Sequence, residues 1–263
     1  MNEGGQFLAF VMIRWFQIRY LNSRIDEVAF NIWSVVLYLL KNELPSFKFY
    51  FMKKFILLLL CLFVVLVGKS QTHRLLFQTD YGNFKVLLYD YTPEHRDLIL
   101  KSIEAKVYKD ALFNRIISDF VVQGGEHDID IEKREAADPT KQKPRLAPEF
   151  NESAFHKVGA LGAGRDGNSE KASFLNQIYF VVGKKITASE LDALELKKNI
   201  KYTADQRSTY LKIGGQPRLD HDFTVFGEIY EGLDVILKIS KVKTDSQDYP
   251  LQQVRFELSE IKD

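Results

Sequence analysis

The chain has 263 residues, of which 46% are hydrophobic and 27% charged, a composition typical of a globular protein. Its 36 basic and 35 acidic side chains leave a formal net charge of +1, so no overall electrostatic field favours a nucleic acid as partner. With one cysteine, Cys61, and five histidines that lack a spacing such as HxxxH, the sequence predicts no disulfide framework, no thiol redox pair and no metal site.

The segment 52–70 has the anatomy of a secretory signal peptide. A basic start at Met52-Lys53-Lys54 precedes an unbroken apolar run, and the small residues Gly68 and Ser70 then predict cleavage after Ser70. The apolar run is shorter than the roughly 20 residues of a membrane-spanning helix, which favours a cleaved signal over a retained anchor. We therefore expect residues 71–263 to be exported to the periplasm or another extracytoplasmic space, with membrane contact only through this segment if it is not cleaved.

Residues 1–51 do not fit a normal export signal, which begins the chain. Their two apolar stretches, 7–13 and 28–40, are too short to span a bilayer, and polar residues interrupt the longer one. The simpler interpretation is that the true start is Met52 and that residues 1–51 are an upstream extension. The alternative is an additional membrane-associated hairpin.

The exported body is expected to begin with a hairpin and a helix. Residues 75–79 and 84–89 have strand-type composition, and the Asp-Tyr-Gly-Asn sequence at 80–83 between them is typical of a turn. A helix is expected next, because Thr92 offers an N-cap hydroxyl and Pro93 stands at the first helical position. Apolar residues then recur at helical spacing.

Short strands and one long loop are expected in the middle of the chain. Residues 112–117 and 120–123 have the composition of two short strands. The stretch 126–148 is charged and rich in turn residues, which predicts a surface loop. Two further strands are expected at 159–161 and 177–182.

Helical composition appears in residues 186–199 and again in residues 204–213. Thr187 or Ser189 is expected to cap the first of these helices, and Thr203 the second. The simpler interpretation of these two helices is a surface elaboration packed beside the main fold. A recognition or docking role is the alternative, because loop insertions often carry function.

The end of the body is expected to hold a strand at 223–229, a short amphipathic helix at 232–240 and a closing strand at 254–261. The body as a whole therefore contains about eight strands and only two core helices. Strands and helices do not alternate regularly, which argues against a parallel α/β sheet. This pattern predicts a mainly β fold and favours a β-barrel.

Residues 162–167, Gly-Ala-Gly-Arg-Asp-Gly, match the dinucleotide-binding pattern GxGxxG. That pattern requires a preceding strand, a following helix and a surrounding βαβ unit. Here the segment 168–176 leads into another strand, so we expect no nucleotide to bind. Neither GxSxG nor HExxH occurs in the chain, which leaves a hydrolase without support.

One segment, Phe113 to Gly125 (FNRIISDFVVQGG), closely resembles the signature of cyclophilin-type peptidyl-prolyl cis–trans isomerases. Three later blocks, 155–161, 176–181 and 219–235, resemble further strands of that family in the same order. The resemblance implies a closed eight-stranded antiparallel barrel capped by two helices, to which residues at about 186–213 add a helical insertion. It also implies an enzyme without metal or cofactor that acts on proline-containing polypeptides, and we expect a monomer.

The resemblance also implies a set of site residues. Arg115 would donate a hydrogen bond to the prolyl nitrogen of a twisted amide, Gln123 would position the substrate carbonyl and Arg115, and Phe120 would line the proline pocket. The implied substrate-binding residues are Val121, Gly164, Arg165, Gln177, Tyr179, Leu219 and Phe223. Without the resemblance, Arg115 is an ordinary strand-end arginine and Phe120 a core aromatic.

Several positions depart from the family's pattern. Asn114 stands where histidine is usual, Val121 where methionine is common, and Arg218 where the best-known members carry tryptophan. Arg165 and Phe223 also differ from common family residues. Two functions therefore stay open: an isomerase that assists the folding of exported polypeptides, and a weakly active or inactive proline-peptide-binding module or chaperone.

Overall fold

The computed structural model describes residues 72–262. The predictions for residues 1–51, for the signal peptide at 52–70 and for Cys61 lie outside these described residues. Within the described part of the chain, no helix is both long and apolar enough to cross a lipid bilayer.

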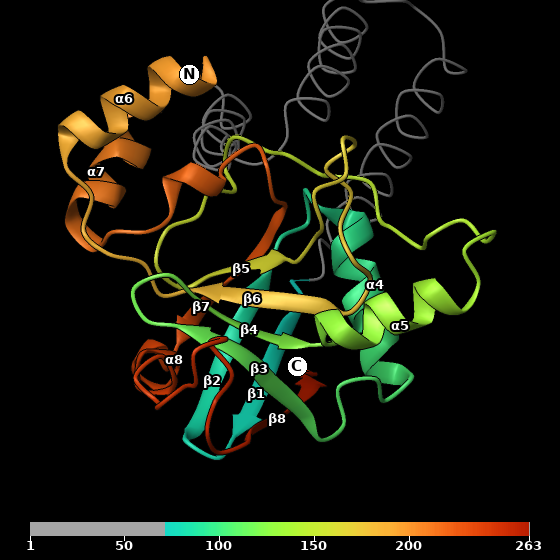
Figure 1. Cartoon of the computed structure of the whole chain (residues 1–263). Helices are drawn as coiled ribbons and strands as arrows, with labels where there is room; N and C mark the ends of the chain where they lie inside the picture. Colours follow the sequence, from blue (N-terminus) through green and yellow to red (C-terminus); the bar gives the residue numbers. More distant parts are fainter. Residues whose placement is uncertain (1–71, 263) are drawn as a thin grey trace, which may run out of the picture. The chain divides into compact units, whose positions relative to one another are not determined.

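Eight strands form a closed antiparallel barrel (Figure 1). Around the barrel their order is β1-β2-β7-β5-β6-β4-β3-β8. In chain order they are β1 Arg74–Thr79, β2 Gly82–Leu88, β3 Ala111–Ile117, β4 Val121–Gly125, β5 Ala160–Ala163, β6 Gln177–Val181, β7 Val225–Glu231 and β8 Val254–Glu260. The predicted fold is confirmed, and closure pairs every strand on both sides, which leaves no open edge.

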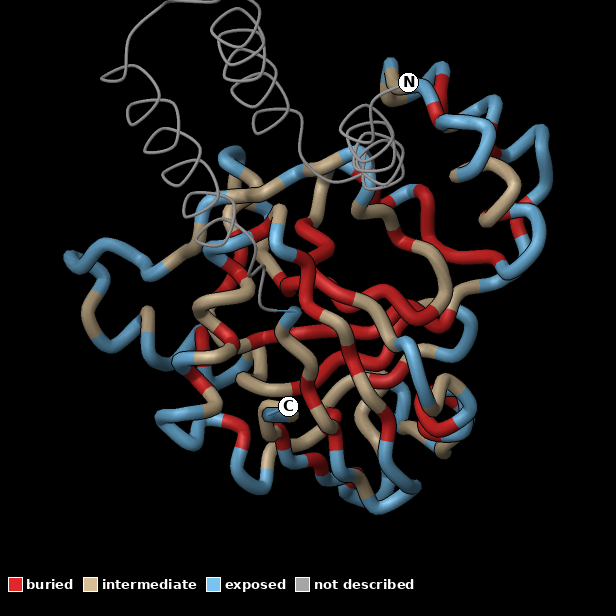
Figure 2. The backbone as a smooth tube through the Cα atoms, turned by 180° about the vertical axis from the view of Figure 1, so that it is seen from behind, coloured by how far each residue is buried: buried red, intermediate tan, exposed pale blue. Residues whose placement is uncertain are grey.

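The barrel interior is packed with aromatic rings. Phe77 stacks on Phe84 with ring centroids 4.7 Å apart, and each meets the ring of Phe180 edge-on at 5.1 Å. Phe113 stacks on Phe256 at 4.4 Å. Figure 2 shows that the buried segments gather in the middle of the described part of the molecule. Side chains of a strand alternate between its two faces, so these inward rings account for the alternating apolar positions of the sequence.

Two helices pack against the barrel, as predicted. Helix α4, Pro93–Glu104, lies beside β8, and helix α8, Leu233–Ile239, lies beside β2 (Figure 1). Pro93 occupies the first position of α4, where its missing amide hydrogen costs nothing.

The capping of α4 differs from the prediction. Thr92 stands at the N-cap position, but its hydroxyl donates to the carbonyl of Tyr89 and not toward the helix. The amides of Glu94 and His95 donate instead to the carboxylate of Glu149, at 3.1 and 2.9 Å. A carboxylate at a helix N-terminus is favoured by the helix dipole. Glu149 lies far along the chain, so local sequence did not reveal this cap.

The loop predicted at 126–148 is wrong in part, because Asp128–Ala137 form helix α5. The ring of His127 caps this helix by accepting a hydrogen bond from the amide of Ile129 at 3.1 Å. Only one side chain of α5, Ile131, is buried. A short helix with a single buried residue lacks the apolar periodicity by which helices are predicted.

The insertion is confirmed as a pair of helices, α6 Ala188–Lys198 and α7 Ala204–Ile213. Of the two predicted candidates Thr187 is the cap of α6, and Thr203 caps α7 as predicted; both form reciprocal capping boxes. Most of this helical pair is exposed, as Figure 2 shows. Its small apolar core consists of Ile186, Leu191, Tyr202 and Tyr210, with Phe155 and Ile200 packed against it.

Candidate active site

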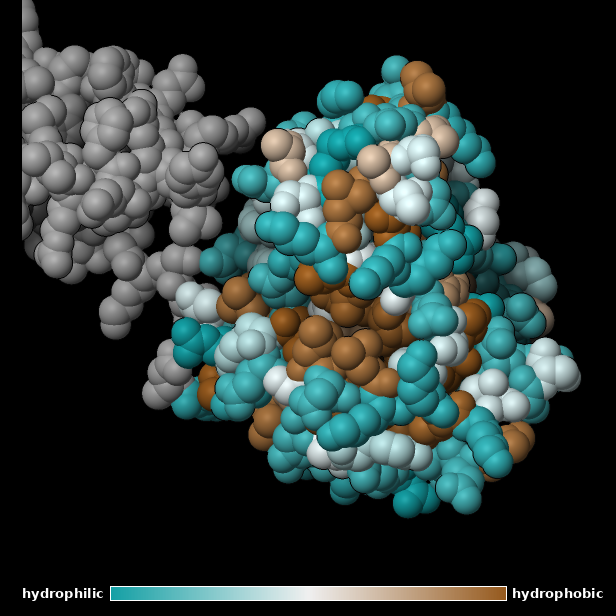
Figure 3. Space-filling model, turned by 90° about the vertical axis from the view of Figure 1, so that its left-hand side faces the viewer, coloured by the Kyte–Doolittle hydropathy of each residue, from teal (hydrophilic) through white to brown (hydrophobic). Residues whose placement is uncertain are grey.

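The outer face of strands β4, β5 and β6 carries a second apolar cluster. Along β4, Val122 belongs to the barrel interior whereas Val121 belongs to this outer cluster, as alternation requires. Figure 3 shows apolar side chains gathered at mid-height on the side of the molecule that bears the insertion. The outer cluster contains Tyr89, Val121, Ala160, Tyr179, Val181, Leu219 and Val225, with Phe120 and Phe223 packed against it. An apolar barrel face of this kind marks a candidate binding surface.

Arg115 reaches this outer face because strand β3 carries a bulge at Asn114. The register pairs Phe113 and Arg115 with consecutive residues of β4, so Asn114 is one extra residue. Phe113 therefore points into the core while Arg115 points outward, although regular alternation would place both on one face. The Asn114 side-chain amide donates to the carbonyl of Gly125 at 3.0 Å, which holds the bulge.

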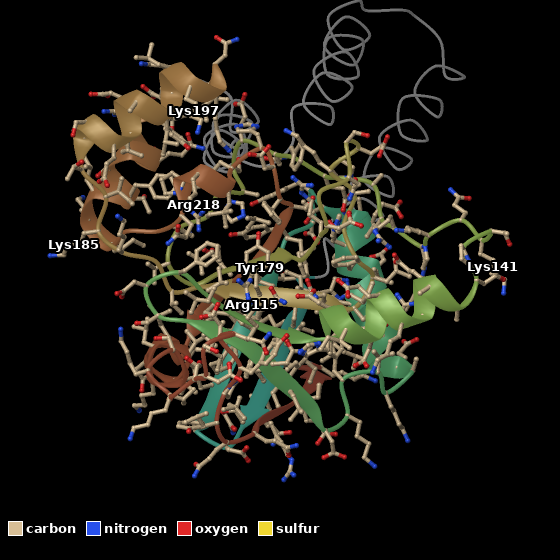
Figure 4. All side chains as sticks on the ribbon, in the orientation of Figure 1. Arg115, Lys141, Tyr179, Lys185, Lys197 and Arg218 are labelled. Carbon is tan, nitrogen blue, oxygen red and sulfur yellow. The ribbon has the colours of Figure 1, made fainter. Side chains whose placement is uncertain are left out.

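Four residues lie in one row across the outer face. Arg115 on β3 faces Gln123 on β4, Gln123 faces Tyr179 on β6, and Tyr179 faces Gly162 on β5. Directly opposite residues of paired strands point to the same side and have Cβ atoms about 4.5–5.5 Å apart. The row therefore brings a guanidinium, an amide and an aromatic ring together, and Figure 4 shows Arg115 and Tyr179 on this part of the barrel.

A groove of about 170 Å³, named here the outer groove, lies along this row. It is lined by Arg115, Phe120, Val121, Gln123, Asp128, Gly164, Arg165, Gln177, Tyr179, Leu219 and Phe223. Every site residue that the resemblance implied is thus brought to one place. Of the lining residues only Asp128 was not predicted, because the stretch that contains it was expected to be a loop.

Arg115 lies at the open edge of the outer groove. Its Nη2 atom is 3.6 Å from Oδ2 of Asp248, and the two side chains are 36% and 40% exposed. An ion pair this long and this exposed contributes only about 0–1 kcal/mol, so the guanidinium remains able to turn toward a ligand. Asp248 belongs to the loop before β8, and the sequence analysis missed it because it lies far from Arg115 along the chain.

Gln123 lies between Arg115 and Tyr179 and is 8% exposed. Among the described residues its side-chain amide has no hydrogen-bond partner, and it makes no hydrogen bond to Arg115, the residue it faces across β3 and β4. A nearly buried amide is stabilised when a partner satisfies it. The donors and the acceptor of Gln123 are therefore available to a ligand.

Three aromatic rings form the apolar wall of the outer groove. The ring of Tyr179 meets the ring of Phe223 edge-on, at a centroid distance of 6.1 Å and an angle of 86°. The guanidinium of Arg218 lies 4.2 Å from the centroid of Phe120, and that of Arg165 lies 4.7 Å from the centroid of Phe223. These cation–π contacts hold the rings and bring positive charge to the rim of the groove.

Gly162 and Gly164 make room for two of the lining side chains. A Cβ atom at position 162 would overlap the ring of Tyr179, and one at position 164 would overlap the side chain of Gln177. Between β5 and the antiparallel strand β6 the chain forms no helix. The glycines of the GxGxxG match therefore allow close packing on the outer groove. The segment lacks the following helix and the βαβ unit that a dinucleotide-binding loop requires.

Helix α5 contributes to the site through its first residue. The side-chain amide of Gln177 donates to Oδ1 of Asp128 at 2.6 Å and to the carbonyl of Glu126 at 3.2 Å. Gln177 is 3% exposed, so these two bonds determine how its amide faces the groove. Helix α5, which was not predicted, thus orients Gln177, one of the predicted site residues.

The hydroxyl of Tyr179 belongs to a buried polar network. It lies 2.8 Å from Nε2 of His156, whose Nδ1 lies 2.6 Å from Oδ1 of Asp220, and the rings of His156 and Tyr179 are within 9° of parallel. Burial, and after it the negative charge of Asp220, raises the pKa of Tyr179 well above its ordinary value. The hydroxyl therefore keeps its proton, and the neutral ring serves as an apolar wall.

Comparison with known proteins agrees with this arrangement. The family model described as "Cyclophilin type peptidyl-prolyl cis-trans isomerase/CLD" matches residues 74–260. A curated Staphylococcus saprophyticus protein that bears a peptidyl-prolyl cis-trans isomerase name is 29% identical over 199 residues, which cover 72% of this chain and 91% of that protein. Peptidyl-prolyl cis-trans isomerase CYP18-2 of Arabidopsis thaliana is 25% identical over 187 residues, which cover 71% of this chain and 92% of that protein.

Solved structures share the fold. A crystal structure of a Cryptosporidium parvum cyclophilin type peptidyl-prolyl cis-trans isomerase covers 73% of this chain and 99% of its own, with a TM-score of 0.53 at 14% identity. A second structure of that protein, determined in the presence of the dipeptide Ala-Pro, gives a TM-score of 0.52. With the family model matched over nearly all of the described residues, this chain belongs to the cyclophilin-type peptidyl-prolyl cis–trans isomerase family.

Proposed function

We propose that the outer groove accelerates cis–trans isomerisation of X–Pro bonds in exported polypeptides and thereby assists their folding. One observation carries the proposal: Arg115 stands opposite Gln123, and both lie beside an apolar wall that would accept a proline ring. Uncatalysed X–Pro isomerisation takes tens to hundreds of seconds, which is slow enough to limit folding.

The reaction requires rotation about one bond and breaks none. Amide resonance opposes that rotation with a barrier of about 18–20 kcal/mol. As the amide twists, its nitrogen loses conjugation and gains a lone pair, to which the guanidinium of Arg115 would donate a hydrogen bond. An interaction that forms only with the twisted amide lowers the barrier without tightening ground-state binding.

The remaining lining residues would hold the polypeptide in place. Phe120, Tyr179 and Phe223 would enclose the proline ring, and the free amide of Gln123 would donate to a substrate carbonyl. Gln177, oriented by Asp128, would bind the residues that precede the proline. Held this way, the substrate meets Arg115 without a search for the correct orientation.

The extracytoplasmic location is supported by the sequence of residues 52–70, with its basic start, apolar run and small residues before Gln71. Mass spectrometry of the protein purified from its own cells tests it. We expect a mature N-terminus at Gln71. Peptides from residues 7–40 in the mature protein would contradict this part of the proposal.

A proline-peptide-binding module with little turnover is the second candidate. It is favoured by the pairing of Arg115 with Asp248 and not with Gln123, and by the departures from the family's pattern at Val121, Arg165 and Arg218. Such a module would bind proline-containing segments with the same wall. It would differ from an isomerase only in the rate of rotation.

A protease-coupled isomerisation assay on the full chain separates the two functions. We expect Arg115→Ala to lower kcat/KM by about 10²-fold, as the loss of a transition-state hydrogen-bond donor typically does. Arg255→Ala, which removes an exposed arginine of β8 outside the groove, is the matched control and should keep full activity. Equal rates for wild type, Arg115→Ala and buffer would exclude the enzyme and leave the binding module.

A further inference from the structure

Buried hydrogen bonds join the helical insertion to the outer groove. Tyr202, between α6 and α7, and Tyr210, on α7, place their hydroxyls 3.0 and 2.6 Å from Oδ2 of Asp220. Both tyrosines are buried, at 4% and 0% exposure. Asp220 directly follows Leu219, which lines the groove. Polar groups of the insertion therefore contact Asp220, the residue next to the groove-lining Leu219.

Asp220 is the centre of this network. Its Oδ2 accepts hydrogen bonds from the two tyrosine hydroxyls, of which that of Tyr202 is shared with the carbonyl of Pro217 at 3.0 Å. Its Oδ1 accepts hydrogen bonds from the backbone amide of His156 at 2.9 Å and from the ring Nδ1 of His156 at 2.6 Å. A carboxylate that is only 4% exposed is stable only when hydrogen bonds replace its lost hydration. Two of the four donors come from the insertion. The orientation of Asp220 therefore depends on Tyr202 and Tyr210.

The tyrosine hydroxyls of the insertion remain donors. Burial raises the pKa of both Tyr202 and Tyr210 above the ordinary value, and the negative charge of Asp220 raises it further. Both hydroxyls are therefore protonated at neutral pH. Asp220 accepts from both hydroxyls, and the carbonyl of Pro217 is a second acceptor for that of Tyr202.

His156 transmits this orientation to Tyr179. Because a carboxylate only accepts, the hydrogen of a neutral His156 is on Nδ1, and Nε2 is then the acceptor for the Tyr179 hydroxyl. The Tyr179 ring is also confined by Gly162, where no Cβ fits, and by the edge of Phe223. The hydrogen bond to His156 is thus the polar contact that sets the ring within the apolar wall.

We propose that the 186–213 insertion is a positioning element of the outer groove: Tyr202 and Tyr210 orient Tyr179 through Asp220 and His156. The position of the Tyr179 ring in turn sets the shape of the wall that receives the proline. This inference rests on the proposed function, since that function assigns the wall to proline. Tyr202 and Tyr210 are positioning residues, because neither lines the groove.

The insertion has other attachments that do not involve the hydroxyls. Its apolar core packs the rings of Tyr202 and Tyr210 against Phe155. The Lys198 ammonium donates to the carbonyl of Asp220 at 2.6 Å and pairs with Asp222 at 2.7 Å. Removal of the two hydroxyls should therefore leave the insertion folded and in place while it loosens Asp220.

The double variant Tyr202→Phe/Tyr210→Phe tests the proposal, because it removes two oxygen atoms and keeps both rings. In the full chain we expect kcat/KM to fall about three- to tenfold, mainly through a higher KM, the size of effect that one or two hydrogen bonds produce. Tyr108→Phe is the matched control, since Tyr108 is buried in the barrel core outside this network. It should leave kcat/KM unchanged.

A double-mutant cycle distinguishes positioning from general destabilisation. If the two hydroxyls act through Tyr179, the same double change should have no further effect on kcat/KM in a Tyr179→Phe background. Effects that simply add would overturn the proposal. Thermal unfolding of every variant shows whether lost activity follows lost stability.

A spectroscopic measurement keeps the inference separate from the proposed function. In protein with ¹³Cζ-labelled tyrosine, the Tyr179 resonance is identified by its loss in Tyr179→Phe. We expect the chemical shift of this resonance to change in the Tyr202→Phe/Tyr210→Phe variant and to remain unchanged in Tyr108→Phe. A wild type without turnover would contradict the isomerase while this shift still supported positioning. An unchanged Tyr179 resonance would overturn positioning whatever the turnover.

Discussion

Arg115 and Gln123 are direct partners on the neighbouring strands β3 and β4, and they face the same side because Asn114 is bulged out of β3. The bulge separates the inward Phe113 from the outward Arg115. A shift of one residue exchanges the two faces of a strand, so the catalytic proposal depends on this irregularity.

Asn114→Ala should weaken the bulge. It removes the hydrogen bond to the carbonyl of Gly125 at 3.0 Å, and we expect the free energy of unfolding to fall by about 1 kcal/mol, as one hydrogen bond typically contributes. Isomerase activity should fall as well, because Arg115 is held less firmly on the outer face. Chemical denaturation and the coupled assay measure the two effects. A variant as stable and as active as wild type would contradict a structural role for the Asn114 amide.

Gly162→Ala should displace the Tyr179 ring. The added Cβ overlaps that ring, and overpacking of this kind costs about 1–3 kcal/mol. We expect a lower midpoint of thermal unfolding and weaker binding of a proline-containing peptide, measured by calorimetry. Gly167→Ala is the matched control, since a Cβ there meets no atom within 4 Å. Equal peptide affinity in the two variants would show that the groove tolerates a moved Tyr179.

Arg218 should make the enzyme prefer acidic residues near the proline. Its guanidinium lies over Phe120 and donates to Gln216 at 3.2 Å, and no carboxylate of the described residues pairs with it. An exposed ion pair with a substrate glutamate contributes about 0.2–1 kcal/mol, or up to about fivefold in kcat/KM. We expect peptides with glutamate after proline to exceed matched lysine peptides by such a factor.

Arg218→Gln should abolish that preference, and added salt should weaken it in the wild type. Lys185→Gln removes the same charge from an exposed position at the edge of the molecule, away from Arg115 and Tyr179 (Figure 4). This control should keep the preference. If both variants lose it equally, the effect comes from net charge and not from Arg218.

His95 should make stability depend on pH. Burial lowers the pKa of His95 below its ordinary value of 6.5, and the hydrogen bond to Glu149 offsets this only in part. The unfolded chain therefore takes up a proton at a higher pH than the folded chain. The free energy of unfolding is then greatest above about pH 6.5, the ordinary pKa of histidine, and falls as the pH decreases through the folded pKa.

Denaturation curves between about pH 7 and pH 5, on either side of the ordinary histidine pKa, measure this loss. His95→Gln should flatten the dependence, whereas His221→Asn, at an exposed left-handed position that asparagine tolerates, should retain it. Burial would raise the pKa of Asp166, but hydrogen bonds from Arg145 and Asn168 lower it to about 2, so Asp166 takes up its proton below this pH range. A slope that survives in His95→Gln would show that another group carries the dependence.

Part of the fold followed from local sequence. The eight strands appear within two residues of their predicted bounds, because short runs of strand-type composition between turn residues are typical of strands. The N-caps of α6 and α7 also followed from local sequence, since a cap and its partner are only three residues apart, although Thr187 and Ser189 were both candidates for α6. Local sequence did not predict helix α5, because that helix buries only one residue. It also did not predict the cap of α4, because the capping carboxylate belongs to the distant Glu149.

The sequence by itself determined the family resemblance and the residues of the site, since the segment Phe113 to Gly125 holds Arg115, Phe120 and Gln123 together in one hairpin. Only the tertiary structure decided which side chains surround them. The bulge that turns Arg115 outward, the contact with Asp248, and the network from the insertion to Tyr179 all join segments that are remote in sequence or depend on strand register. Local patterns carry no record of such contacts, because barrel closure and packing bring those atoms together.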